Sequence, residues 1–507
     1  MRVFTVLVFG LLFVTPRGFA QETKHKAPLV LAWDVMPRTY DPRYAVDANS
    51  QYLENLLHCS LIEFTADGQV EKSVAQEWRW LKPTVLEVHI RDDVTFADGS
   101  KLSSAEVKAT YDFFLEAKPK HPSPRSAAFK NVLAIEAAPR KVIFTLREPD
   151  PGFITNMVVG ILPRALAKDM MITAEHKVLG CGPFVLESAH LTGLSLRANT
   201  QYVLGPQAKS AQVEIKAVKD ENTCFLKLQK GEVDITQNAV SLDRLETLSK
   251  DYPQLKVLHR PGLNTSYLGF NAEDPVLRNK LVRQAIDVAI DRQAIIKYLL
   301  KGMAIPARTL LLPGDKFYNP SLPVLEFNPA KAKVLLDQAG YKPGAEGIRF
   351  ALTFKTSNNA TRTAIAKAIA SNLLAVGIKV SVLSLDWGKF KLDVDKGHVQ
   401  MWGLSWVGFK DPTIYNYAFA TSNFPPHGAN RGRFSQPALD ALFSQAQLST
   451  AEEPRRKIYE EVQKIVAEEA PYVFLYHEDK VAILNKAVEG FQVYADGRYS
   501  AMATAHK

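Results

Sequence analysis

The sequence lacks the features that mark several classes of protein. It has three cysteines in 507 residues, too few for a disulfide-rich scaffold, and neither a repeat nor a low-complexity tract. Beyond the first residues, no stretch reaches the run of about 18 apolar residues that a transmembrane helix requires. Charged residues make up 23% and hydrophobic residues 47% of the chain, as in globular proteins. Disordered, collagen-like and coiled-coil proteins are therefore excluded, and the length suits roughly three domains.

Sequence motifs typical of enzymes are missing as well. There is no G-x-S-x-G, H-E-x-x-H, P-loop or complete G-x-G-x-x-G segment. The 11 histidines are scattered, and Cys59, Cys181 and Cys224 lack metal-site spacing. Two of these cysteines can form one disulfide, which leaves one free thiol. We therefore expect no catalytic residue, no cofactor, no metal site and no enzymatic activity.

Positive charge is in modest excess. The formal net charge is +9, and the densest basic patches, residues 118–125 (KPKHPSPR) and 455–457, are short. Such patches are more typical of a solvated loop and a helix face than of a nucleic-acid interface. We expect no nucleic-acid partner.

The first twenty residues have the pattern of an export signal. Arg2 is followed by the apolar run 3–14, and residues 18–20 (GFA) place small residues at a cleavage site. No cysteine near Ala20 offers a lipid-attachment site. The pattern predicts cleavage after Ala20 and a free periplasmic protein without a lipid anchor.

Three helix starts carry capping signals. Ser103 with Glu106 forms a capping-box pattern, and so does Thr450 with Glu453. Asn328, followed by Pro329, begins a third apolar-periodic segment that Gly340 ends. These patterns predict helices that begin after residues 103, 328 and 450.

Strand patterns alternate with the helices. Segments with alternating, β-branched residues are 85–90, 142–146, 349–354 and 378–385, and an expected helix at 364–376 separates the last two. A strand, helix and strand in this order imply a right-handed crossover between parallel strands. The fold class is therefore predicted as α/β with more than one sheet.

Residues 401–419 (MWGLSWVGFKDPTIYNYAF) are rich in aromatic side chains, with six in nineteen residues. Aromatic residues interrupted by Gly, Pro and a single Asp suit a loop that lines a binding pocket. The alternative is a strand and turn in the hydrophobic core.

Five segments together resemble the extended periplasmic solute-binding proteins of ABC importers, a family that carries peptides and, in some branches, nickel or opines. They occur in the family's order along nearly the whole chain: 96–107 (FADGSKLSSAEV), 180–184 (GCGPF), 231–235 (GEVDI), 264–271 (NTSYLGFN) and 282–292 (VRQAIDVAIDR). The resemblance is to solute-binding protein family 5.

This resemblance implies a two-lobed periplasmic-binding-protein fold, type II, cluster C, with an extra α/β domain inserted in the first lobe. The expected divisions are a signal peptide at 1–20, lobe I at 21–68, the extra domain at 69–178, lobe I again at 179–265, lobe II at 266–480, and a C-terminal return to lobe I at 481–507. The protein is expected to be a monomer whose two lobes close over the ligand.

The resemblance also implies the ligand-binding residues. They are Asp411, Trp406, Trp402, Phe409, Tyr267, Asn271, Asn430 and Arg431. The family places an Asp for the ligand's amino group three residues after the loop Trp, where this chain has Phe409, so Asp411 is the carboxylate left for that role. Its alternative role is to cap a turn. Where dipeptide-binding members place an Arg for the ligand carboxylate, this chain has residues 356–358 (TSN), with Arg362 nearby.

The function implied is capture of a peptide or similar small solute and its delivery to ABC permease subunits in the inner membrane. The first alternative keeps the fold but binds a non-peptide solute, such as a metal chelate, an opine or another cationic or amphipathic compound. The second is a secreted hydrolase, for which the sequence offers no activated nucleophile.

Overall fold

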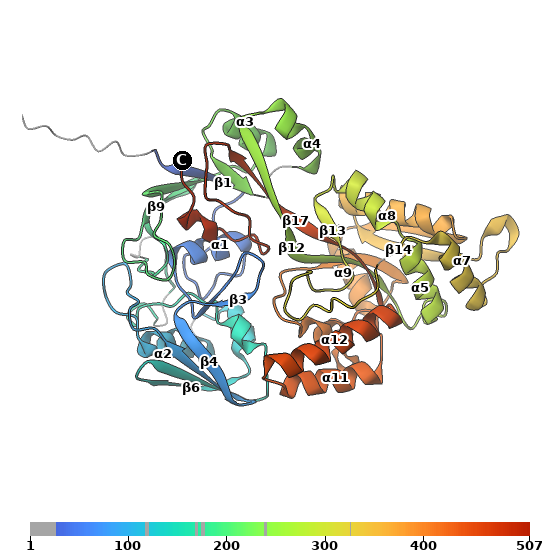
Figure 1. Cartoon of the computed structure of the whole chain (residues 1–507), viewed down its shortest axis with the longest axis horizontal. Helices are drawn as coiled ribbons and strands as arrows, with labels where there is room; N and C mark the ends of the chain where they lie inside the picture. The colour runs from blue at the N-terminus through green and yellow to red at the C-terminus, as the bar shows by residue number, and fades with distance from the viewer. Residues whose placement is uncertain (1–26, 117–120, 168–170, 174–177, 238–240, 325) are drawn as a thin grey trace, which may run out of the picture.

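The computed structural model describes residues 27–116, 121–167, 171–173, 178–237, 241–324 and 326–507 (Figure 1). The predicted signal peptide and its cleavage site lie outside these residues. Within the described chain, the strands form sheets of eleven, four and two strands. The large mixed sheet has the order β15-β14-β16-β12-β17-β11-β1-β10-β9-β8, with β13 (Ala304–Pro306) paired to β17. The prediction of an α/β fold with more than one sheet is confirmed.

One half of the large sheet builds the body on the left of Figure 1, which we call lobe I. Its central strand β1 (Leu29–Trp33) is buried on both faces, as the uninterrupted apolar sequence LVLAW predicts. The other elements of this half are β8 (Phe184–His190), β9 (Gly193–Ala198), β10 (Gln212–Ala217), β11 (Ile235–Gln237), α1 (Ala48–Leu57), α3 (Glu221–Gln229) and α4 (Leu242–Asp251).

A second, antiparallel sheet extends lobe I at the lower left of Figure 1. Its order is β4 (Ala75–Lys82), β5 (Val85–Ile90), β7 (Lys141–Leu146) and β6 (Val132–Ala138). Helix α2 (Ser104–Asp112) packs on it through Tyr111, whose ring meets that of Phe144 edge-on at 5.4 Å. The predicted capping box of Ser103 and Glu106 begins this helix.

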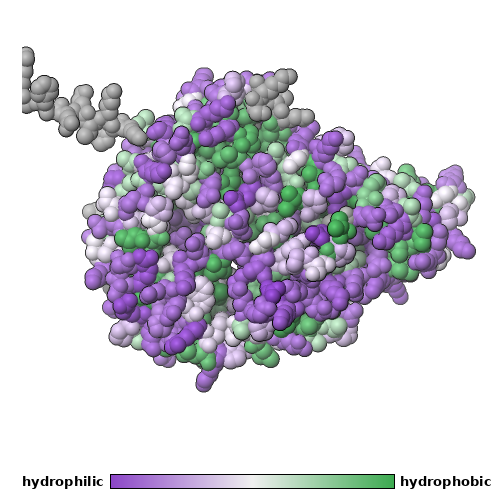
Figure 2. All heavy atoms as spheres, viewed as in Figure 1, coloured by the Kyte–Doolittle hydropathy of each residue, from purple (hydrophilic) through white to green (hydrophobic). Residues whose placement is uncertain are grey.

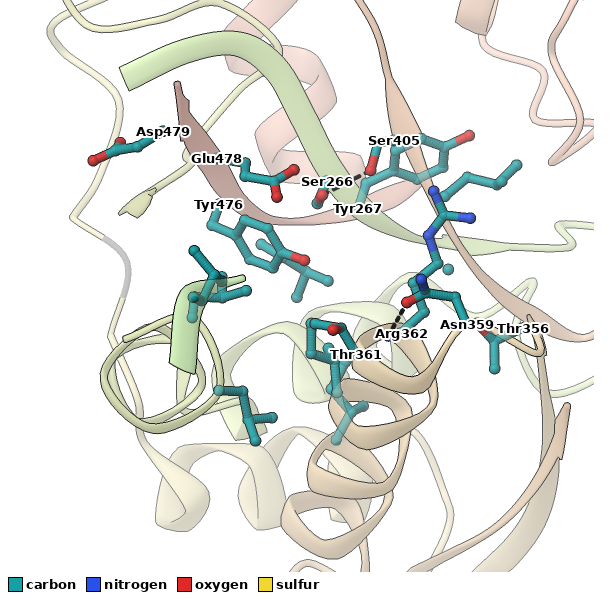
Figure 3. Close-up of a pocket in the computed structure, with 18 of the residues that line it drawn as sticks. Ser266, Tyr267, Thr356, Asn359, Thr361, Arg362, Ser405, Tyr476, Glu478 and Asp479 are labelled. Carbon is teal, nitrogen blue, oxygen red and sulfur yellow. Dashed lines mark hydrogen bonds between the residues drawn. The ribbon is translucent and has the colours of Figure 1, made fainter. Parts of the chain in front are cut away.

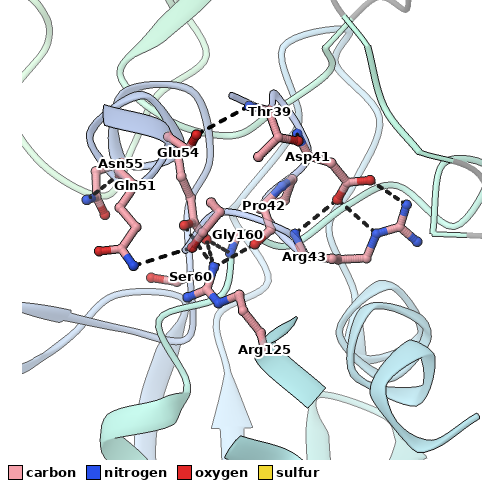
Figure 4. A network of polar contacts seen from close by, with 12 residues as sticks. Thr39, Asp41, Pro42, Arg43, Gln51, Glu54, Asn55, Ser60, Arg125 and Gly160 are labelled. Carbon is pink, nitrogen blue, oxygen red and sulfur yellow. Dashed lines mark hydrogen bonds and ion pairs between the residues drawn. The ribbon is translucent and has the colours of Figure 1, made fainter. Parts of the chain in front are cut away.

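Two tertiary links join chain segments that lie outside the strands of this sheet. Both carboxylate oxygens of Glu54 accept hydrogen bonds of 2.9 Å from Arg125, and one also accepts from the Gly160 amide at 2.8 Å (Figure 4). Cys59 and Cys181 form the disulfide, with their Cα atoms 5.1 Å apart. Cys224 is the remaining, buried thiol.

The other half of the large sheet builds lobe II, on the right of Figure 1. Parallel strands β14 (Phe350–Ser357) and β15 (Ile378–Leu385) flank α8 (Ala360–Leu374), so the predicted βαβ unit is confirmed. The remaining elements include β16 (Met401–Trp406), α5 (Lys280–Ala289), α7 (Pro329–Gln338), α9 (Trp387–Lys396), α10 (Ile414–Phe419), α11 (Pro437–Leu448) and α12 (Glu452–Glu469).

The helix ends of lobe II were predicted with mixed success. Asn328 caps α7 as expected, with its side chain accepting a hydrogen bond from the Lys331 amide. The capping box predicted for Thr450 and Glu453 is wrong, because α12 begins only at Glu452 and has no side-chain cap. Glu453 instead pairs with Arg456 at 2.7 Å. A carboxylate in the first helical turn can pair with a basic side chain one turn on.

Two long antiparallel strands, β12 (Leu255–Phe270) and β17 (Tyr472–Asn485), join the lobes. Their lobe I ends pair with each other beside β11, whereas their lobe II ends pair with each other beside β16. The register shifts between Pro261 and Thr265, where the strands pass from one lobe to the other. The boundaries expected after residues 265 and 480 fall within these strands, and the exact domain limits stay a prediction.

The surface is predominantly polar in the view of Figure 2, where hydrophilic residues cover most of both lobes. Among the described helices, none is long and apolar enough to cross a membrane.

Candidate functional site: the cleft between the lobes

The loop at residues 407–413, between β16 and α10, extends from lobe II to lobe I. The Lys410 ammonium lies 2.8 Å from the Asp496 carboxylate and 3.6 Å from the centre of the Phe64 ring, both in lobe I. The Gly408 amide donates to the Asn264 side chain at 3.2 Å, beside the crossing point of the strands. The aromatic segment therefore does contain a loop at the lobe interface.

Lys410 is held in an environment that disfavours its charge. Burial, together with the nearby positive charge of Arg498, lowers the pKa of Lys410 to about 8 even though Asp496 pairs with it. Burial would raise the pKa of Asp496, but the charges of Arg498 and Lys410 hold it well below its usual range. The contact between the lobes is thus a cluster of two cations, Lys410 and Arg498, around one carboxylate, Asp496.

Asp411, the carboxylate of this loop, forms a two-pronged ion pair within lobe II. Arg455 of α12 lies 2.6 Å from Oδ1 and 2.9 Å from Oδ2, and the Thr413 amide donates to Oδ1 at 2.9 Å. Burial would raise the pKa of Asp411, but the charge and hydrogen bonds of Arg455 lower it. Asp411 therefore does cap a turn and also has an internal cation as partner.

Further carboxylates surround this ion pair. The pKa values of Asp150 and Asp315 are raised, by burial first and then in part by the charge of Asp411. A Cβ built at Gly152 would lie only 2.9 Å from Asp411 Oδ1, so the backbone of lobe I closely approaches this group. Three carboxylates, Asp150, Asp315 and Asp411, therefore act on one another beside the cations of Arg455, Lys316 and Lys410.

Cavities lined by both lobes border the loop. One of about 370 Å³ lies between β4 of lobe I and α12 of lobe II, and it includes Lys410, Asp411 and Arg455 in its lining. Another of about 350 Å³ is lined by Thr155 of lobe I and by Phe409, Lys410 and Asp411. Each cavity is formed by both lobes, which is the arrangement that a closing cleft requires.

A third cavity, of about 460 Å³, lies where the lobes meet beside the crossing strands (Figure 3). Residues 241–243 of lobe I line it together with Tyr476 and Glu478 of β17 and Arg362 of α8. Burial raises the pKa of Tyr476 to about 12, although a hydrogen bond from Ser266 lowers it. The negative charge of Glu478 raises this pKa further, and the positive charge of Arg362 lowers it. A carboxylate and a guanidinium therefore lie near the same hydroxyl group.

Some of the predicted site residues gather at one place. The rings of Tyr267 and Trp406 stack with their centres 6.2 Å apart, and the Arg431 guanidinium lies 5.5 Å from the Trp406 ring. Phe409 and Asp411 share the smaller loop cavity. Trp406 is half-buried.

Other predicted site residues are engaged within lobe II. Trp402 is fully buried and packs against Gly269, where a Cβ would lie 2.4 Å from the indole. The amide nitrogen of Asn271 donates to the carbonyls of Gly397 and Val399, and that of Asn430 donates to the carbonyls of Ala420 and Phe434. These side chains support the walls around the loop.

Three charged residues of the cleft carry no recognisable signal in the sequence: Lys410, Asp496 and Glu478. Lys410 directly precedes Asp411, yet a lone lysine in a loop gives no sign of burial. Asp496 follows β17 by eleven positions and reaches the cleft only because the C-terminal segment returns to lobe I. Only their spatial meeting with the loop marks them.

Two lobes joined by two crossing strands, with cavities lined from both sides, define a ligand-binding protein. The sequence profile of the bacterial extracellular solute-binding proteins, family 5, matches residues 69–425, more than half of the chain. The chain belongs to this family, as its motifs indicated.

Three relatives illustrate the similarity. The glutathione-binding protein GsiB of Salmonella typhi is 27% identical over 477 residues, which cover 91% of each chain. HbpA2 of Haemophilus parasuis has 25% identity and a TM-score of 0.83, over 95% of this chain and 99% of that one. The oligopeptide-binding protein AppA of Bacillus subtilis, in complex with a nonapeptide, has 24% identity and a TM-score of 0.67 over 95% and 99%.

Proposed function

We propose that this protein captures short peptides in the cleft between its lobes, in the periplasm, and delivers them to an ABC permease. The observation that carries the proposal is the cavity beside the crossing strands, where the guanidinium of Arg362 and the carboxylate of Glu478 lie near the Tyr476 hydroxyl. A short peptide carries one charge of each sign at its ends, and opposite charges on the walls recognise both.

The loop at 407–413 supplies a second reason. Asp411 lies close enough to Asp150 and Asp315 to raise the pKa of both, so a ligand amine would find acidic groups beyond the one that Arg455 neutralises. We propose that Asp411 attracts such an amine together with Asp150 and Asp315, with Trp406 and Phe409 as the apolar wall. Five side chains of lobe II hold this wall in place: Tyr267, Trp402, Asn271, Asn430 and Arg431.

The relatives support a peptide ligand. GsiB is named for glutathione, itself a tripeptide, and AppA was solved with a nonapeptide. A non-peptide solute of the same charge pattern is the alternative within the fold. Among the described residues, no group of three or more His, Cys, Asp or Glu side chains is placed to hold a metal ion.

Thermal melts against a panel of free tripeptides, a metal chelate and an opine test the ligand class. A ligand present at a hundredfold excess over its dissociation constant should stabilise the folded protein by about 2.7 kcal/mol. Stabilisation by the chelate or opine and by no peptide would contradict the proposal.

The role of Arg362 can be tested with Ala-Ala-Ala and its C-terminal amide. We expect the wild type to prefer the free acid by roughly tenfold, and Arg362→Gln to lose most of that preference, because a hydrogen bond to a charged group is removed. Lys367→Gln, an exposed position of the same helix, is the matched control. A preference that is unchanged in Arg362→Gln would place the ligand carboxylate elsewhere.

Export and oligomeric state complete the proposal. N-terminal sequencing of periplasmic material should begin at Gln21, and gel filtration should give a monomer. Recovery only in the membrane fraction with Met1 retained would contradict the predicted export signal.

A further inference from the structure

A cavity of about 510 Å³ lies in lobe II near the apolar wall of the cleft that Trp406 and Phe409 form. It is formed by the C-terminal part of α9 and by the chain at residues 425–433. Its lining includes four basic side chains and one carboxylate: Lys391, Lys396, Arg431, Arg433 and Asp395. Of these four cations the family resemblance implied only Arg431, and the ion pairs of the cleft loop use none of them.

The carboxylate of Asp395 is already shared by two of the cations. Arg431 Nε lies 2.9 Å from its Oδ1, and Lys391 pairs with its Oδ2. Lys396 makes no ion pair with any residue that the structure describes. The acidic partner of Arg433 is Glu273, at 3.6 Å and with a side chain that is 64% exposed, which leaves the pair weak. The cavity therefore keeps a net positive charge.

The two arginines are held in fixed positions before any ligand arrives. Their side chains are only 15% and 16% exposed. Arg433 donates to the Asp395 and Arg431 carbonyls at 3.1 Å, and it packs so tightly on Gly397 that a Cβ there would lie 2.4 Å from the guanidinium. A guanidinium that is already oriented loses little conformational freedom when it binds an anion.

This cavity adjoins the cleft at Tyr417, which packs against Trp406 of the apolar wall. Tyr417 lines both this cavity and the smaller loop cavity that contains Asp411, and its ring lies 6.1 Å from that of Trp406. Arg431, which also lines this cavity, lies 5.5 Å from the Trp406 ring. Tyr417 therefore borders both the loop cavity and the cavity with the basic side chains.

We propose that this cavity is an anion subsite of the cleft, and that it selects peptides with an acidic side chain. This inference rests on the proposed peptide function and narrows its substrate class. A side-chain carboxylate would take Lys396 and Arg433, whose charges are least neutralised, and would share Arg431 with Asp395.

Calorimetry with Gly-Gly-Glu and Gly-Gly-Gln tests the selectivity, because the two peptides differ only in the charge of one side chain. We expect the wild type to bind Gly-Gly-Glu roughly tenfold more tightly, and the preference to fall below about threefold in Lys396→Gln and in Arg433→Gln. Lys389→Gln, an exposed lysine of α9 outside the cavity lining, should keep the wild-type preference. Equal affinity of the wild type for both peptides would overturn the inference.

A second probe separates this inference from the proposed function. Citrate, a tricarboxylate without an amine, should bind the wild type at low ionic strength and bind Lys396→Gln at least fivefold more weakly, with Lys389→Gln unaffected. If citrate behaves in this way while neither peptide binds, the anion subsite stands and the peptide function fails. If both lysine variants weaken citrate equally, the binding is a general surface effect and the subsite is refuted.

Discussion

The ion pair between Asp411 and Arg455 gives the sharpest test of how the cleft loop is held. Asp411→Asn preserves the size of the side chain and leaves an oxygen that accepts from the Thr413 amide, but it removes the charge. Arg455, whose side chain is only 6% exposed, then remains buried without its bidentate partner. The change therefore isolates the charge interaction from the turn.

The expected magnitude follows from burial. Removing one partner of a buried ion pair costs about 3 to 5 kcal/mol because it leaves an uncompensated charge. The charge of Arg455 also acts on Asp150, which compensates part of the loss. We therefore expect Asp411→Asn to lower the free energy of unfolding by about 3 kcal/mol, the lower end of this range.

A double-mutant cycle with Arg455→Gln is the assay, with unfolding by guanidinium followed by tryptophan fluorescence. The double variant should be more stable than the sum of the two single effects predicts, by at least about 1.5 kcal/mol, since neither charge is then left alone. Effects that add within about 0.5 kcal/mol would refute the reasoning, because they would show that the two charges do not interact.

The same variant tests whether Asp411 also attracts the ligand. If it does, N-acetylation of a peptide ligand should weaken binding to the wild type by about 2 to 5 kcal/mol and should weaken binding to Asp411→Asn far less. Equal losses on acetylation in both proteins would show that the amine is held elsewhere.

Three further predictions concern stability. Because the pKa of Lys410 in the folded protein is lowered to about 8, the folded protein binds this proton less tightly than the unfolded chain does. The free energy of unfolding should therefore rise between pH 8 and 10.5, by up to about 3 kcal/mol relative to Lys410→Met. Parallel pH profiles of the two proteins in urea would contradict this. Burial lowers the pKa of His477 to about 4, so stability should fall as pH drops from 6.5 to 4, and His477→Gln should flatten that part of the profile in thermal melts. Replacing Cys59 and Cys181 with Ser opens a loop of 122 residues, which should lower the free energy of unfolding by about 5 kcal/mol and lower the denaturant midpoint. An unchanged midpoint would show that this bond does not constrain the unfolded chain.

Local patterns in the sequence were sufficient for the elements of the fold. The strands at 85–90 and 378–385 were predicted with the bounds that the structure shows, because their alternation of apolar and β-branched residues reports which face is buried. The capping box at Ser103 succeeded for a similar reason, since both of its hydrogen bonds are made within four residues. The same pattern at Thr450 failed because Glu453 had a competing partner, Arg456, one turn along the helix.

The sequence by itself determined the family and the loop that enters the cleft, because ordered motifs and an unusual density of aromatic residues are local properties of a chain. Only the tertiary structure decided what the loop's charges do. Asp411 faces Arg455, 44 positions away, and Lys410 faces Asp496, 86 positions away. Whether a carboxylate is free for a ligand depends on which cation the fold brings to within 3 Å, and no spacing along the chain encodes that distance.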